Sequence, residues 1–200
     1  MSEQPLPSYY NSLEASLEHA LGLLSRGVKD RRSAFHTLTV ATANADGSIE
    51  QRTVVNRGFD RTNRTLRFHT DTRAPKLAQL RDNPRASVHI YDARAKIQVR
   101  LAAVARVHLD TELHQTAWDA TRPFSRECYR VVATPGTKVP SPEDLAFLAA
   151  DDPDAGKNHF AAVTLQIHSL EWLYLAHQGH RRAKFAWDKE GQLSSSWLVP

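Results

Sequence analysis

The sequence predicts a mainly β protein with about eight antiparallel strands and three or four peripheral helices. The first observation behind this prediction is that apolar and polar residues alternate along several segments, which is the period of a half-buried strand. The second is that most links between these segments are short. Long sequential antiparallel strands with short links favour a closed or partly closed barrel.

One helix and three strands are predicted in the first third of the chain. Leucines at helical spacing predict a helix over residues 11–26; they are Leu13, Leu17, Leu21 and Leu24. Alternation predicts strands over 35–43, 48–56 and 65–70. The pair Asp46-Gly47 favours a turn between the first two strands.

The middle of the chain is predicted to continue with a helix and two more strands. Thr72 is a candidate helix cap, and Pro75 fits the first turn of the helix that follows it. Strands are expected over 86–91 and 96–108. The second of these is the clearest strand in the sequence, because one of its faces is apolar throughout.

The last part of the chain is predicted to hold helical segments and then strands. Residues 110–132 have a helical pattern that Pro123 should break. Loops are expected over 133–142 and 151–157, with a helix start at 141–144. The remaining strands are predicted over 160–168, 171–176, 181–187 and 193–199. The barrel should therefore extend from about residue 35 to residue 200.

Composition excludes several classes of protein. The 200 residues are 41% hydrophobic and 24% charged, which is typical of a globular protein with one sizeable core. We therefore expect a single domain over residues 1–200. No apolar run approaches the roughly 20 residues of a membrane-spanning helix, and the first ten residues lack the apolar core of a signal peptide. The only cysteine, Cys128, cannot form an internal disulfide. These features predict a cytoplasmic protein with no membrane partner.

The common catalytic motifs are missing from the sequence. It has no dinucleotide glycine fingerprint, no P-loop and no Gly-x-Ser-x-Gly elbow. His177 and His180 are the only histidines within four residues of each other, and no cysteine or acidic residue lies beside them, so no metal site is predicted. Cys128 lies in a predicted helix between Glu127 and Tyr129, and we interpret it as an unreactive thiol. No catalytic side chain is predicted.

Positive charge is concentrated in residues 51–100. This quarter of the chain holds twelve Arg and Lys residues and four Asp residues, a surplus of eight, whereas the whole chain has a net charge of +4. Such a local surplus indicates an anionic partner, and a phosphate fits it best. Four of these arginines lie in or near predicted turns and are expected only to be solvated; they are Arg61, Arg64, Arg81 and Arg94.

The remaining basic residues of this quarter predict a phosphate pocket. Arg52 lies on one predicted strand and Thr70 ends another, while Arg73 and Lys76 lie at the head of the next helix. A helix N-terminus and an arginine fork both favour an anion. Gln98, on the polar face of strand 96–108, adds an amide that both donates and accepts hydrogen bonds.

This arrangement resembles the pyridoxamine 5′-phosphate oxidase family and its FMN-binding split barrel. The resemblance rests on four segments, which are residues 52–57, 68–76, 98–100 and the tail from 172 to 200. It implies a split β-barrel, FMN as the cofactor, and a homodimer with FMN at the subunit interface. It assigns the redox chemistry to the flavin. The residues that it assigns to FMN are Arg52, Thr53, Val54, Val55, His69, Thr70, Arg73, Lys76 and Gln98, with Trp172 and Lys184 reaching the flavin of the other subunit.

The substrate positions depart from the family pattern. The resemblance implies that the substrate contacts Arg57, Trp118, Arg122, Arg126, His180 and Arg182. Of the four positions that hold the vitamin B6 phosphate in the family, only Arg122 keeps the usual residue. The family's Arg-Lys pair in the helix is Pro75-Lys76 here, with Arg73 expected to substitute. FMN binding is therefore better supported than oxidation of pyridoxamine phosphate.

Four functions remain open at the level of sequence. The leading one is an FMN-binding oxidoreductase that acts on an unidentified small molecule. The alternatives within the fold are a true pyridoxamine or pyridoxine 5′-phosphate oxidase and a non-catalytic flavin-binding protein. The last is a basic barrel that binds single-stranded nucleic acid, which needs aromatic platforms among its basic residues. Residues 51–100 offer only Phe59, Phe68 and Tyr91, which disfavours nucleic acid as a partner.

Overall fold

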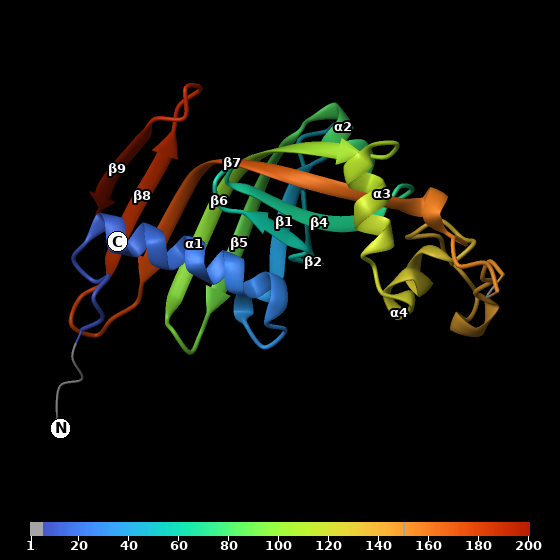
Figure 1. Cartoon of the computed structure of the whole chain (residues 1–200), viewed down its shortest axis with the longest axis horizontal. Coiled ribbons are helices and arrows are strands. Elements are labelled where there is room, and N and C mark those ends of the chain that lie inside the picture. Colours follow the sequence, from blue (N-terminus) through green and yellow to red (C-terminus); the bar gives the residue numbers. More distant parts are fainter. Residues whose placement is uncertain (1–5, 150) are drawn as a thin grey trace.

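The computed structural model describes residues 6–149 and 151–200, and in this part of the chain nine strands form one curled antiparallel sheet (Figure 1). The predicted mainly β class is confirmed. The strands are β1 (Thr37–Ala43), β2 (Ile49–Val55), β3 (Gly58–Asp60), β4 (Thr65–Asp71), β5 (Arg85–Asp92), β6 (Ile97–His108), β7 (Phe160–Tyr174), β8 (Arg181–Trp187) and β9 (Leu193–Leu198). The helices are α1 (Leu13–Lys29), α2 (Pro75–Asp82), α3 (Glu112–Asp119) and α4 (Pro123–Arg126). No helix in the described residues is both long enough and apolar enough to cross a membrane.

The strand order places β8 and β9 at one end of the molecule and the edge strands β2 and β3 away from them. The main path of the sheet is β2-β1-β5-β6-β7-β4-β3, and β8 and β9 extend it from β7. In Figure 1, β8 and β9 lie at the left end and α3 and α4 at the right, while α1 runs across one face of the sheet. Among the residues that the structure describes, β2 pairs only with β1, so it is an edge strand.

The core lies between α1 and the sheet. Leu17, Leu21 and Leu24 of the predicted leucine stripe are buried in it, and Leu13 packs against its rim. Leu66 and Phe68 of β4 point into the same core, as the alternation predicts. Burial of each such side chain contributes about 1.5–3 kcal/mol, so the amphipathic pattern of α1 accounts for its position.

Helix α1 approaches the chain that follows it very closely at Gly27. A Cβ atom built at this position would lie 2.1 Å from the backbone oxygen of Phe35, which no side chain tolerates. The oxygen of Gly27 also lies 2.7 Å from Nδ1 of His36. Glycine is therefore required where the end of α1 packs against residues 34–36.

Several boundaries differ from the sequence prediction. The strands expected over 160–168 and 171–176 are one continuous strand, β7. The register between β6 and β7 shifts between Ala102 and Ala103. A β-bulge adds one unpaired residue, and the hydrogen-bonded pairing continues after it. The alternation of apolar and polar residues is therefore interrupted although the strand is not. The expected helix start at 141–144 gives only a 3₁₀ turn, Pro142–Asp144.

Of two predictions near helix ends, one is wrong and the other is confirmed. Thr72 does not cap α2; its hydroxyl donates to the oxygen of Asn158 at 3.2 Å, and Ala74 occupies the cap position without a side-chain hydrogen bond. The break predicted at Pro123 is confirmed, since α3 ends at Asp119 and proline begins α4. Proline fits a first turn because it has no N–H to leave unpaired.

Candidate functional site

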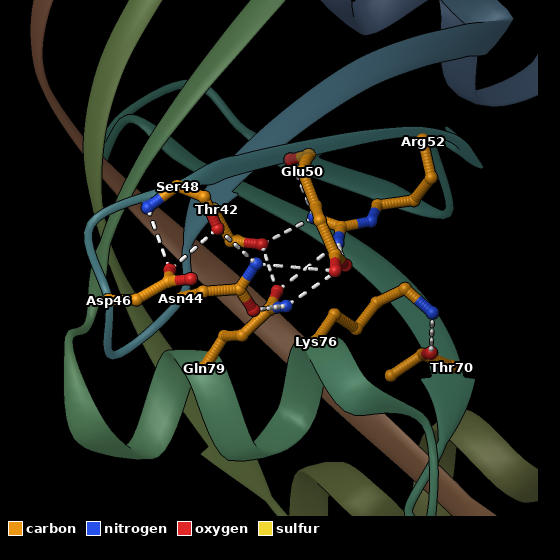
Figure 2. A network of polar contacts seen from close by, with 9 residues as sticks. All are labelled: Thr42, Asn44, Asp46, Ser48, Glu50, Arg52, Thr70, Lys76 and Gln79. Carbon is orange, nitrogen blue, oxygen red and sulfur yellow. Dashed lines mark hydrogen bonds and ion pairs between the residues drawn. The ribbon is translucent and has the colours of Figure 1, made fainter.

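Three of the residues expected to bind phosphate come together where β2 and β4 face the start of α2. We call Arg52, Thr70 and Lys76 the cationic cluster. Nζ of Lys76 donates a hydrogen bond of 3.1 Å to Oγ1 of Thr70, and Arg52 lies on the neighbouring strand edge (Figure 2). The sequence prediction that these segments converge agrees with this geometry.

Two buried polar side chains hold Arg52 in place. Thr42 accepts a hydrogen bond from the guanidinium, and Oε1 of Gln79 accepts another at 3.1 Å. Oε1 of Gln79 also accepts from the hydroxyl of Thr42, so the three side chains form a closed set. Thr42 and Gln79 are both buried, and buried hydrogen bonds of this kind orient a charged group firmly.

The electrostatics of the cationic cluster favour a bound anion. Burial lowers the pKa of Lys76 from its usual value, and the positive charge of Arg52 lowers it further. Burial also lowers the pKa of Arg52. Two partly buried cations near each other destabilise one another; the carboxylate of Glu50 offsets part of this repulsion, and a bound anion would offset more. The N-terminus of α2, which has no side-chain cap, adds a partial positive charge beside Lys76.

The rest of the expected flavin contacts lie on both faces of the sheet. On β2, Val54 is part of the core, whereas Thr53 is exposed on the other face. Pairing of the strands places Thr53 on the same face as His89, and Nε2 of His89 lies 3.2 Å from Oε1 of Gln98. Gln98 therefore lies on the face opposite to Arg52, and only a ligand that passes the edge of the sheet would contact both. Val55, also on β2, is half-buried.

Arg73 is not directed at the cationic cluster. Its guanidinium forms bonds of 2.9 and 2.7 Å with Asp71 and donates to the oxygens of Val131 and Val132. These contacts engage all three guanidinium nitrogens. The expectation that Arg73 substitutes for a phosphate-binding residue is therefore replaced by a structural role, in which it fixes segment 131–132 to the end of β4.

His69 lies on the opposite face of β4 from Thr70, beside a second, strongly basic hollow. This basic pocket has a volume of about 310 Å³. Within the described residues it is lined by no Asp or Glu, and its cationic side chains are Lys29, Arg31, Arg57, Arg67 and Arg122. His69 and Thr70 were expected to serve one ligand, but successive residues of a strand point to opposite faces.

Two buried nitrogen atoms of the basic pocket have no hydrogen-bond partner in the described residues. They are Nε of Arg67 and Nε2 of His69. Burial lowers the pKa of His69 to about 3, and the charges of Arg67 and Arg57 act in the same direction. The imidazole is therefore neutral at physiological pH. An unpaired guanidinium N–H beside it fits an anionic ligand group.

The structure brings together only part of the expected substrate set. Arg57 and Arg122 line the basic pocket, but Trp118 is fully buried and donates from Nε1 to Asp154 at 2.7 Å. Arg126 donates to the backbone oxygens of Thr121, Pro153 and Trp118, and its guanidinium lies 4.5 Å from the centre of the Trp118 ring. The expectation that Trp118 and Arg126 contact substrate is therefore corrected, because both side chains form hydrogen bonds to residues 153–154 instead.

The tail residues lie at the other end of the molecule. Trp172 is fully buried, and its ring packs edge-on against Tyr9 at 5.7 Å, so the structure does not present it to a ligand on the surface. Lys184 is exposed on β8, and Arg182 binds the carboxylate of Glu171 at 2.6 Å. His180 is exposed. Strand β8 is remote from α2 in Figure 1, so Lys184 and the cationic cluster do not meet within one chain.

Sequence reasoning missed the polar residues that support the two sites. No sequence pattern identifies Thr42 of β1 or Gln79 of α2 as a neighbour of Arg52, because both contacts arise from tertiary packing. Arg67 could have been found, because it alternates with Leu66 and Phe68 on the face of β4 that holds His69. Lys29 and Arg31 reach the basic pocket only through the packing of α1.

Part of the chain matches a known protein family. Residues 13–109, nearly half of the chain, match the family described as "Pyridoxamine 5'-phosphate oxidase, FMN-binding domain". This match confirms the resemblance seen in the sequence and supports FMN as the cofactor. The matched range contains Arg52, Thr70 and Lys76. A comparison with curated proteins finds no match.

Solved structures share the fold over nearly the full length of the chain. A pyridoxamine 5′-phosphate oxidase-related, FMN-binding protein from Nostoc punctiforme PCC 73102 is 22% identical, with a TM-score of 0.73 and coverage of 98% of this chain and 100% of that one. PhzG from Burkholderia lata 383, in complex with tetrahydrophenazine-1-carboxylic acid, is 19% identical, with a TM-score of 0.73 and coverage of 98% of both chains. At these identities the likeness shows the fold, and the predicted split barrel is confirmed.

Proposed function

Because residues 13–109 match the FMN-binding domain of the pyridoxamine 5′-phosphate oxidase family, we propose that this chain is an FMN-dependent oxidoreductase for a small anionic molecule. The proposal includes a single domain over residues 1–200, a homodimer and a cytoplasmic location, as expected from the sequence. The observation that carries it is the cationic cluster, which lies within the matched residues and has the charge and the helix terminus that a phosphate requires.

The side chains near the cationic cluster would bind and orient the cofactor. Lys76 and Arg52 would hold the phosphate of FMN, and the hydroxyl of Thr70, which accepts from Lys76, would donate to it. Gln98 and Thr53 lie on the exposed face of the sheet, where the ring system would extend. FMN supplies the hydride chemistry when bound, so no side chain need act as a nucleophile.

The basic pocket supports an anionic substrate. Its five cations and lack of acidic lining favour a carboxylate or phosphate group, and its volume of about 310 Å³ suits a small molecule. PhzG, which shares the fold, forms a complex with a molecule that is itself a carboxylic acid. In this proposal Arg57 and Arg122 bind the anionic group, with the neutral imidazole of His69 beside them.

The positions of Trp118 and Arg126 favour a substrate other than pyridoxamine phosphate. Both side chains are committed to contacts within the chain, so two of the four expected vitamin B6 positions do not face the basic pocket. Turnover of pyridoxamine 5′-phosphate at a rate typical of enzymes would favour the true oxidase. A protein that binds FMN but reduces or oxidises no small carboxylate or phosphate tested would favour a non-catalytic flavin carrier.

Flavin content of the purified protein tests the proposal directly. We expect absorbance in the flavin bands and FMN, not riboflavin or FAD, in the mass spectrum of the released cofactor. A colourless protein that takes up no added FMN would contradict the proposal. Steeply salt-dependent binding of oligonucleotides by that colourless protein would instead revive the nucleic-acid hypothesis.

A further inference from the structure

One carboxylate already lies among the cations where the phosphate is proposed to bind. Oε2 of Glu50 forms an ion pair of 3.0 Å with Arg52 and accepts a hydrogen bond of 3.0 Å from Nε2 of Gln79 (Figure 2). Its other oxygen accepts from Nδ2 of Asn44 at 3.3 Å. Asn44 and Gln79 are themselves joined by a hydrogen bond of 2.6 Å, so the carboxylate is held by donors on three sides.

Glu50 and its neighbours occupy the terminal nitrogens of Arg52. One of these nitrogens donates to Thr42 and to the backbone oxygen of Glu50, and the other donates to the Glu50 carboxylate and to Gln79. A guanidinium has five N–H groups, so only the one on Nε has no partner in the described residues. A phosphate cannot form the usual paired contact with Arg52 unless one of these acceptors leaves.

Lys76 is in the opposite situation. Its ammonium group has three N–H donors but donates only to Thr70 among the described residues. Burial and the charge of Arg52 lower the pKa of Lys76, and the negative charges of Asp71 and, to a smaller extent, Glu50 raise it, so the Glu50 carboxylate is near enough to act on both cations. Glu50 therefore neutralises part of the positive potential that would attract a phosphate.

Glu50 is also the acceptor that can leave. Its side chain is 49% exposed and lies on the edge strand β2, directly after the turn at residues 44–48. Thr42 and Gln79 are buried and have no such freedom. An exposed ion pair contributes little to stability, and water can replace the hydrogen bonds that Gln79 and Asn44 donate to an exposed carboxylate, so Glu50 can rotate into solvent at small cost.

We infer that the Glu50 carboxylate is an internal competitor of the FMN phosphate, and that it reduces the preference of the site for FMN over riboflavin. The inference rests on the proposed function, because it takes the cationic cluster as the phosphate site. Glu50 holds Arg52 in position while the site is free of phosphate. On binding, the phosphate displaces the carboxylate from Arg52, and the two anions then repel each other across the site.

Titration of the flavin-free protein with FMN and with riboflavin tests the inference through quenching of flavin fluorescence. Glu50→Gln keeps the shape and the hydrogen-bonding groups but removes the charge. We expect it to bind FMN about three- to tenfold more tightly than the natural protein, the range in which an exposed ion pair and one like-charge contact act. Riboflavin has no phosphate, so its affinity should be the same in both proteins.

Asp46→Asn is the matched control. Asp46 lies in the same turn, but its carboxylate bonds to Ser48 and not to a cation. Its neutralisation should change FMN affinity much less than that of Glu50. If Glu50→Gln fails to fold, Glu50→Asp provides the test, because the shorter side chain withdraws the carboxylate from Arg52 and should also tighten FMN binding.

The outcomes separate this inference from the proposed function. If the natural protein binds FMN and Glu50→Gln binds it no more tightly, or tightens riboflavin equally, the inference is wrong while the proposed function stands. Equal tightening by Asp46→Asn would also overturn it, since the effect would then be general charge and not competition for Arg52. If none of the proteins binds FMN, both the proposed function and the inference fail.

Discussion

Arg52 is the residue on which the phosphate site depends most. It is positioned by the buried side chains of Thr42 and Gln79 and carries a charge that no other residue of β2 can supply. Arg52→Ala should weaken FMN binding by about 1.5–3 kcal/mol, the contribution of a charge-assisted hydrogen bond. Fluorescence titration measures the change. An unchanged affinity would mean that the phosphate binds elsewhere.

His69 should make the stability of the protein depend on pH. Its pKa is about 3 in the folded chain because of burial and the charges of Arg67 and Arg57, against 6.5 for an ordinary histidine. Between these two values the unfolded chain binds a proton that the folded chain does not, so stability falls as the pH falls through this window.

Replacement of the imidazole tests this linkage. His69→Gln removes the titrating group, so its free energy of unfolding should decrease less on acidification, by up to about 1.4 kcal/mol per pH unit below pH 6.5. Urea denaturation at about pH 7 and about pH 5 compares the two proteins within this window. Parallel losses of stability in both proteins would show that His69 titrates normally in the folded chain.

At the scale of elements, the close approach of α1 to residues 34–36 depends on Gly27. Gly27→Ala would place a methyl group against the backbone of Phe35, which cannot move as a side chain can. We expect a loss of at least about 2 kcal/mol in the free energy of unfolding, as for other overpacked sites.

Gly22 of the same helix provides a matched control. A Cβ atom there meets no atom of the described residues within 4 Å, so Gly22→Ala should stabilise the protein by about 0.5–1 kcal/mol through helix propensity alone. Thermal or urea denaturation of the two variants measures both effects. A Gly27→Ala protein as stable as Gly22→Ala would contradict the packing described for the end of α1.

Most elements could be predicted because their cause is local. The leucine stripe of α1 and the alternation along β6 and β8 are direct consequences of burying one face of a helix or strand. The exceptions have non-local causes. The continuity of β7 depends on its pairing with β6, and the cap position of α2 depends on the contact of Thr72 with Asn158.

At the scale of the molecule, the expected flavin site needs residues that lie too far apart in one chain to contact the same ligand. Arg52 and Lys184 lie on β2 and β8, which are far apart in Figure 1, yet both were expected to contact one flavin. If each site takes Arg52 from one subunit and Lys184 from the other, a mixed dimer of Arg52→Ala and Lys184→Ala chains contains one intact site.

Subunit mixing gives a quantitative test of this arrangement. The two variant proteins, each with weakened FMN binding, should regain about a quarter of the tight sites when they are unfolded together in equal amounts and refolded, since half of the random dimers are mixed and each has one intact site. Sites formed within one chain would regain none. Native molecular mass of the natural protein provides the supporting measurement, and a monomer would exclude the shared site.

Alternation and helix-start residues were enough to predict the fold class and most of the strands, because they are properties of short segments. Charge indicated which basic residues to group into one phosphate site, but the approach of Arg52 to Thr70 and Lys76 depends on the packing of β2, β4 and α2. The packing of the folded chain was needed to show that Arg73, Trp118 and Arg126 bond within the chain, that Trp172 is buried, that His69 belongs to the basic pocket, and that Glu50 pairs with Arg52. The reason is physical: the local sequence around a charged or aromatic residue is the same whether its side chain contacts a ligand or another part of the chain. Its partner is selected by the packing of segments distant in sequence.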